Sequence, residues 1–142
     1  MIDRARLGVT VFAVWLGVSG AALLFAPREI STRLGASGPD VVYQLLAAAL
    51  LGLAAMNHVA RGSALGGIYG RAVVTADQVH FTIGALVLIK LALRHSVAPA
   101  LWIAILAYVA GAVFFNLLLF HGVRPPAQAP PPPPEVGLPS GG

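Results

Sequence analysis

Two side chains inside a long apolar segment are placed to do chemistry together, because Asp77 and His80 are three residues apart. In a helix this spacing puts both on one face, which Gly84 extends by one turn. A carboxylate beside an imidazole can relay a proton or polarise a bound ligand. An ionised Asp at the centre of a membrane helix costs about 2.5–3.5 kcal/mol on the insertion scale, so Asp77 is expected to have a polar partner. The candidate partners are His80, Asn57, Asn116 and Arg71.

Other apolar segments carry polar residues at comparable depth. With a rise of about 1.5 Å per residue, each lies within about 13 Å of a basic residue at the same end of its segment. Because successive helices of a bundle run antiparallel, these side chains fall in one half of the bilayer. We predict a polar layer made of Asp77, His80, Asn57, Asn116 and Thr10. It is either an interhelical hydrogen-bond network or the lining of a ligand pocket.

Two further histidines, His58 and His121, are expected at similar depth near one rim of the bundle. They are possible ligands of a haem-type cofactor, although two histidines alone are a weak pattern. Asp77, His80 and a third histidine make a poorly defined ligand set for a transition metal, so no metal site is predicted. The chain has no cysteine, which excludes disulfides, thiolate catalysis and iron–sulfur clusters. With no H-E-x-x-H and no paired Glu-x-x-His motif, we predict no catalytic residue.

The composition indicates a membrane protein. Of the 142 residues, 58% are hydrophobic and only 10% are charged, whereas soluble domains are about a quarter charged. This excludes an ordinary soluble enzyme, a nucleic-acid-binding domain and a disordered protein. Four apolar segments, each long enough to span a hydrocarbon core, predict helices over 7–26, 41–60, 72–94 and 98–121. Residues 1–124 are therefore predicted to form an all-α, integral membrane, antiparallel four-helix bundle.

Local residues predict how these helices begin, end and pack. Asp40 is placed as an N-cap of the second helix and Pro99 in the first turn of the fourth, and residues 66–71 suit a tight turn. Pro27, followed by two charged residues, is expected to end the first helix. Small residues four apart allow close helix approach, and the pairs are Gly17–Ala21, Ala48–Gly52 and Ala107–Gly111.

Residues 125–142 form a proline-rich C-terminal tail with five consecutive prolines. Such a segment is predicted to be disordered or extended, and it is a candidate for docking on a partner protein. With both termini cytoplasmic, inner segments carry five basic residues and outer segments four, which favours this orientation by a small margin. The abundance of Ala, Gly, Pro and Arg with a single Lys fits a GC-rich bacterial genome. We therefore expect a multi-pass protein of the bacterial cytoplasmic (inner) membrane.

Three features resemble the small four-helix bacterial membrane proteins of the DoxX-like kind. They are Asn57–His58 at the end of the second helix, the turn over residues 66–71, and His80 early in the third helix. The resemblance covers roughly residues 5–122 and leaves out the tail. It implies a four-helix membrane fold, and some DoxX-like proteins are associated with quinone-linked oxidation.

Two functional hypotheses follow. In the first, the chain is a non-enzymatic accessory or structural subunit of a larger respiratory, photosynthetic or transport complex, with lipid and other membrane subunits as partners and no nucleic acid. In the second, it is a self-contained membrane protein that binds a quinone, lipid or haem-type ligand around Asp77 and His80, with an oxidoreductase role as one version.

Overall fold

The computed structural model describes residues 2–36, 38–61, 68–94 and 96–121, which form five helices and, within these ranges, no strand. Four helices are long and apolar enough to cross a membrane: α1 (Ile2–Phe25), α3 (Asp40–Ala60), α4 (Ile68–Arg94) and α5 (Pro99–His121). The fifth is a short helix, α2 (Pro27–Arg33). The described residues thus confirm the all-α class, and four apolar helices of this length are those of a multi-pass membrane protein. The tail over 125–142 lies outside the described residues.

The helix bounds follow the apolar segments closely at most ends. Helix α1 starts earlier than predicted and includes Arg4 and Arg6. Helix α4, the third of the four predicted helices, begins at Ile68, inside the segment predicted as a tight turn. Pro99 opens α5 as expected. Asp40 does not cap α3, because Pro39 occupies the cap position and no side chain caps the helix. Instead Asp40 is in the first turn, and its carboxylate pairs with Arg28.

The short helix α2 was not predicted from the sequence. Pro27 follows the end of α1 as expected, but it also occupies the first turn of a new helix, where its missing N–H is not needed. Gly35 ends α2 with φ of +68°, which glycine adopts without steric cost. The Ala36 N–H donates to the Ser31 carbonyl at 2.9 Å and the Gly35 N–H to the Thr32 carbonyl at 3.1 Å, as in a Schellman motif.

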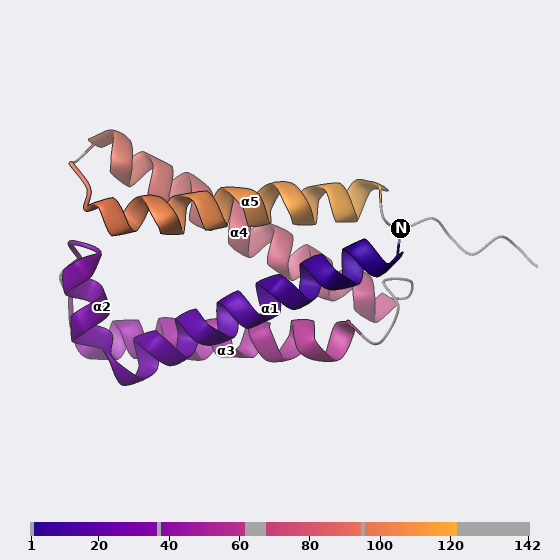
Figure 1. Ribbon diagram of the computed structural model, residues 1–142, viewed down its shortest axis with the longest axis horizontal. Coiled ribbons are helices and arrows are strands. Elements are labelled where there is room, and N and C mark those ends of the chain that lie inside the picture. Colours follow the sequence, from indigo (N-terminus) through magenta and orange to yellow (C-terminus); the bar gives the residue numbers. More distant parts are fainter. Residues whose placement is uncertain (1, 37, 62–67, 95, 122–142) are drawn as a thin grey trace, which may run out of the picture.

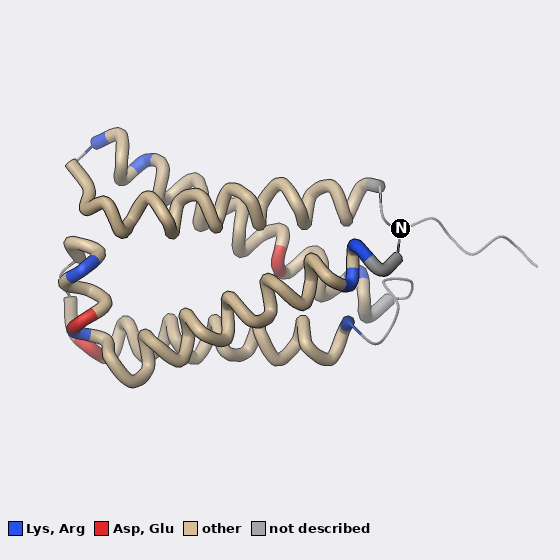
Figure 2. The backbone as a smooth tube through the Cα atoms, in the orientation of Figure 1, with Lys and Arg blue, Asp and Glu red and all other residues tan. Residues whose placement is uncertain are grey.

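The long helices pack as two pairs (Figure 1). α1 lies along α3, and α5 lies along α4, while contacts between the two pairs are sparse. α2 crosses one end of the bundle, next to the start of α3. Charged residues gather at the two ends of the bundle (Figure 2). We call these the α2 end and the N-terminal end.

Small residues bring the helices of each pair together, though not all of the predicted ones. A side chain on Gly20 would meet Leu51 and the Ala47 carbonyl of α3, and Gly17 faces Ala54. The prediction for Ala48 and Gly52 is wrong for contacts within the chain, because both are exposed and no atom lies within 4 Å of a Cβ built on Gly52.

In the α4–α5 pair, glycines accept aromatic rings instead. The Phe81 ring of α4 packs onto Gly111 of α5, and the Tyr108 ring of α5 packs onto Gly84 of α4. Gly8 of α1 accepts the ring of Phe114 in the same way, which links the two pairs at the N-terminal end. Absence of a side chain at these positions lets large rings approach the helix backbone.

Candidate ligand-binding site

A cavity of about 780 Å³ lies between the two helix pairs and reaches toward the α2 end. All five helices contribute to its lining, which is mostly Val, Leu, Ile and Ala side chains. The polar groups at its wall are few and come from Trp15, Ser19, His80 and Tyr108. Pockets for small ligands have volumes of about 300–1,000 Å³ and combine apolar walls with a few convergent polar groups.

His80 and Tyr108 form the main polar feature of the cavity wall. The Tyr108 hydroxyl oxygen lies 3.2 Å from His80 Nε2, and their rings are 5.4 Å apart. Each group can donate or accept a hydrogen bond, depending on the tautomer of the imidazole. Both side chains are partly buried, and both line the cavity, so a ligand there can bond to either one.

The sequence positions this pair through Gly84, one turn after His80 on α4. The Tyr108 ring lies directly on Gly84, so that any Cβ at this position would overlap Cε1 and Cδ1 of the ring. Trp15 of α1 meets Tyr108 edge-on, with ring centroids 5.7 Å apart. The hydroxyl is therefore held toward His80 by contacts from two other helices.

A cluster of aromatic rings packs behind the cavity wall at Trp15, His80 and Tyr108. Phe81 follows His80 on α4, is fully buried, and stacks on Phe115 of α5 with centroids 5.4 Å apart. Phe12 of α1 lies 5.2 Å from Phe81 and 5.3 Å from Phe115. Phe12, Phe81 and Phe115, which we call the aromatic cluster, do not line the cavity themselves.

Asp77 does not line the cavity, and it precedes Phe81 by one helical turn on α4. It is fully buried, as is Asn57 of α3, whose carboxamide faces the Asp77 carboxyl group. Asn57 Nδ2 donates to the Leu53 carbonyl at 3.0 Å. Neither carboxyl oxygen of Asp77 has a hydrogen-bond partner among the described residues, and nor does Asn57 Oδ1. Although Asp77 and His80 are three residues apart, the hydrogen bond of His80 goes to Tyr108.

Asn116 belongs to a third polar group, between α4 and α5. Its Nδ2 donates to its own helix at the Ala112 carbonyl, 2.7 Å away, and to Thr82 Oγ1 at 3.3 Å. Gln78 Nε2 donates to both Asn116 Oδ1 and Thr82 Oγ1 at 3.4 Å. These bonds tie the two helices together, as interhelical hydrogen bonds do in membrane bundles.

The remaining candidate residues lie elsewhere. The Thr10 hydroxyl donates to the Arg6 carbonyl of its own helix at 2.8 Å. His58 is exposed at the end of α3, with Nε2 3.1 Å from a guanidinium nitrogen of Arg61. The side chain of His121 lies outside the described residues. The five residues of the predicted polar layer are therefore divided among separate contacts, and among them only His80 lines the cavity.

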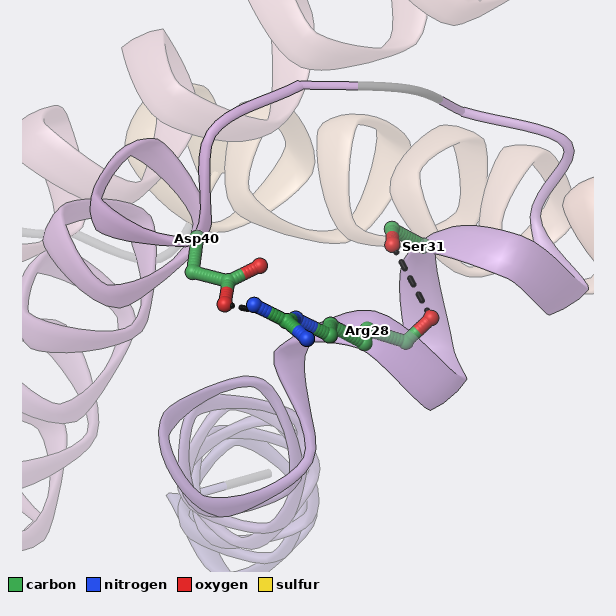
Figure 3. Close-up of polar contacts among 3 residues, drawn as sticks. All are labelled: Arg28, Ser31 and Asp40. Atoms are coloured by element: carbon green, nitrogen blue, oxygen red, sulfur yellow. Dashed lines mark hydrogen bonds and ion pairs between the residues drawn. The ribbon is translucent and has the colours of Figure 1, made fainter.

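α2 covers the outer end of the cavity, where Ile30 and Leu34 contribute to the lining. Figure 3 shows how this helix is attached to α3: Arg28 reaches across to Asp40, with 2.9 Å between Nε and Oδ2. The Ser31 hydroxyl donates to the Arg28 carbonyl at 3.0 Å within α2. The ion pair is largely exposed, so it contributes only about 0–1 kcal/mol.

Sequence reasoning missed the cavity and two of its residues, Trp15 and Tyr108, as ligand-facing groups. A signal for Tyr108 was available, since a hydroxyl within an apolar span requires a partner.

Comparison of the chain with protein-family models, with curated proteins and with solved structures finds no match. The site is therefore interpreted from its own geometry.

Proposed function

We propose that this protein binds an amphiphilic ligand within the membrane, in the cavity between its two helix pairs. The ligand has an elongated apolar body and a head group that exchanges hydrogen bonds with His80 and Tyr108. An isoprenoid quinone and a lipid both have this chemistry. The observation that carries the proposal is a cavity of about 780 Å³ whose walls are apolar except at Trp15, Ser19 and the His80–Tyr108 pair.

The geometry supports binding of the head at the inner end of the cavity. The polar pair lies against Phe81 of the aromatic cluster, and the rest of the lining extends from it toward the α2 end. A ligand with its polar head at His80 therefore has its apolar body along α1, α4 and α5, toward the α2 end. We propose binding and no redox reaction, because reduction of a quinone would require an electron donor in addition to this chain.

The accessory-subunit hypothesis needs no cavity, so the cavity favours the self-contained binding protein. The exposed apolar faces of the long helices suit lipid as well as neighbouring subunits. Deletion of residues 125–142 separates the two hypotheses. A tail adaptor predicts that the deletion removes a co-migrating complex on a native gel. The binding proposal predicts an unchanged native mass and an unchanged ligand content.

Analysis of the co-purified small molecules tests the proposal and identifies the bound molecule as a quinone or a lipid. The protein is extracted from its own membrane in mild detergent, and bound molecules are identified by mass spectrometry. We expect one quinone or lipid class to be enriched over the bulk membrane extract. A redox-active quinone and a phospholipid are distinguished by mass and by the absorbance change on reduction.

Two matched variants of α5 provide the control. Ala104 lines the cavity, whereas Ala110 is exposed on the outer face of the same helix. Ala104→Phe should fill part of the cavity and remove the enriched molecule, and Ala110→Phe should leave it. Equal enrichment in both variants, or none in the unmodified protein, would overturn the proposal.

A further inference from the structure

Asp77 and Asn57 form a buried polar pair that the ligand cavity does not use. Both side chains are fully buried, and they come from α4 and α3, one from each helix pair. Neither residue lines the cavity, and Phe81, one helical turn beyond Asp77 on α4, packs against Phe12 and Phe115. A role for this pair is therefore independent of whatever occupies the cavity.

The Asp77–Asn57 pair has more hydrogen-bond acceptors than donors. Asn57 uses one of its two amide N–H groups to donate to the Leu53 carbonyl, at 3.0 Å, which leaves a single N–H on the side that faces Asp77. Three oxygens are left without a partner among the described residues: both carboxyl oxygens of Asp77 and Oδ1 of Asn57. An ionised carboxylate only accepts hydrogen bonds, and so does an amide oxygen. The pair therefore has three acceptor oxygens for the one N–H that Asn57 has left, a surplus of acceptors over donors.

No cation of the described residues supplies what is missing. The one ion pair among them joins Arg28 and Asp40 at the α2 end. Arg4, Arg6, Arg61 and Arg71 are exposed at the other end of the bundle. His80, the titratable group nearest to Asp77 along α4, is engaged with Tyr108 at the cavity wall. The charged form of a carboxyl group is strongly disfavoured where neither water nor a partner reaches it.

We infer that the Asp77–Asn57 pair is an intramembrane proton-binding site, in which Asp77 holds one proton as a neutral carboxylic acid. The bound proton converts one surplus acceptor into a donor. The new O–H can donate to Asn57 Oδ1 on the facing carboxamide, so that a single proton gives partners to two of the three unpaired oxygens. The same arrangement would suit a small monovalent cation, which the experiment separates from a proton.

Infrared spectroscopy of the full-length protein in lipid vesicles tests this inference. A neutral carboxylic acid has a carbonyl stretch above the amide I band, and this stretch shifts in heavy water. We expect this band at neutral pH, where exposed Asp and Glu side chains are ionised. It should be lost in Asp77→Asn and retained in Asp40→Asn, because Asp40 is exposed to water and paired with Arg28. Only carboxylate bands in the unmodified protein would overturn the inference.

The salt in the buffer distinguishes a proton from a cation. A proton site predicts that the carbonyl band is the same in sodium, potassium and choline buffers. Conversion of the band to carboxylate by sodium or potassium would overturn the inference and assign a cation site instead.

Carbodiimide labelling provides a second readout that does not depend on the variants. The protonated carboxyl group adds across a C=N bond of dicyclohexylcarbodiimide, and the O-acylisourea rearranges to a stable N-acylurea without any oxidation or loss of atoms. Peptide mass spectrometry should locate this adduct at Asp77. Labelling at Asp40 with none at Asp77, together with an absent carbonyl band, would contradict the proton site.

Discussion

The two halves of the interface between the helix pairs differ in how they treat polar side chains. Toward the α2 end the pairs diverge around a cavity of about 780 Å³, and His80 and Tyr108 line open space. Toward the N-terminal end the aromatic cluster fills the interface, and Asp77 and Asn57 have no measurable exposure. The first half has room for a large molecule, whereas in the second the two polar side chains are closed off from solvent. Polar side chains in the two halves therefore have different surroundings, and for this reason we propose different roles for them.

The largest loss of stability is expected from Gly111→Ala, in the closely packed half of the interface. A Cβ at Gly111 would lie 2.5 Å from Cδ1 of Phe81, which is fully buried and cannot move away without disturbing Phe115. Overpacking of this kind costs about 1–3 kcal/mol. We expect a lower unfolding midpoint in detergent. Gly52→Ala is the control, since nothing lies within 4 Å of its Cβ, and a destabilisation equal to that of Gly111→Ala would contradict the account.

Gly84→Ala makes the same change at the edge of the cavity, and a smaller loss of stability is expected. The new methyl group would displace the Tyr108 ring, but this ring lines the cavity and has space to move. We expect less destabilisation than from Gly111→Ala, with a clear loss of ligand affinity because Tyr108 leaves His80. Thermal unfolding and a ligand titration measure the two effects. A larger loss of stability than for Gly111→Ala would show that the cavity half is not the looser one.

Tyr108→Phe removes only the hydroxyl group that bonds to His80. A neutral hydrogen bond contributes about 0.5–1.5 kcal/mol, so ligand affinity should fall about twofold to tenfold. The packing onto Gly84 and Trp15 is kept, and the unfolding midpoint should therefore change little. Unchanged affinity in an equilibrium titration would remove the hydroxyl from the binding site.

The smallest effect is expected from Arg28→Gln, which breaks the ion pair that attaches α2 to Asp40. The Arg28 side chain is 82% exposed, so the pair is well screened by solvent. We expect a loss of at most about 1 kcal/mol, measured by thermal unfolding at low salt and reduced further at high salt. A loss as large as that of Gly111→Ala would mean that α2 organises the cavity more strongly than its contacts indicate.

The sequence was sufficient to predict the four long helices, because unbroken apolar segments of about 20 residues have few other solutions. It could not predict α2, since a seven-residue helix carries no periodic signal and Pro27 reads equally as a stop or a start. The sequence identified Asp77, Asn57 and His80 as the informative residues but grouped them in one layer. Their separation depends on tertiary packing, such as that of the buried Phe81 on His80 and Tyr108, which the sequence alone does not distinguish from any other core contact.

Quenching of Trp15 fluorescence by a quinone is the measurement that tests the central claim most directly. Trp15 lines the cavity, whereas Trp102 is 52% exposed on the outside of α5. In a Trp102→Phe background, Trp15 alone reports on the cavity. The account predicts saturable quenching by a short-chain quinone that Ala104→Phe weakens by about tenfold or more, equivalent to about 1.4 kcal/mol, and that Ala110→Phe leaves unchanged. Competition by added phospholipid would identify a lipid as the tighter ligand of the same cavity. Linear, non-saturable quenching of equal size in both variants would contradict the account, since it would place the quinone in the surrounding lipid and leave the cavity without a ligand of this class.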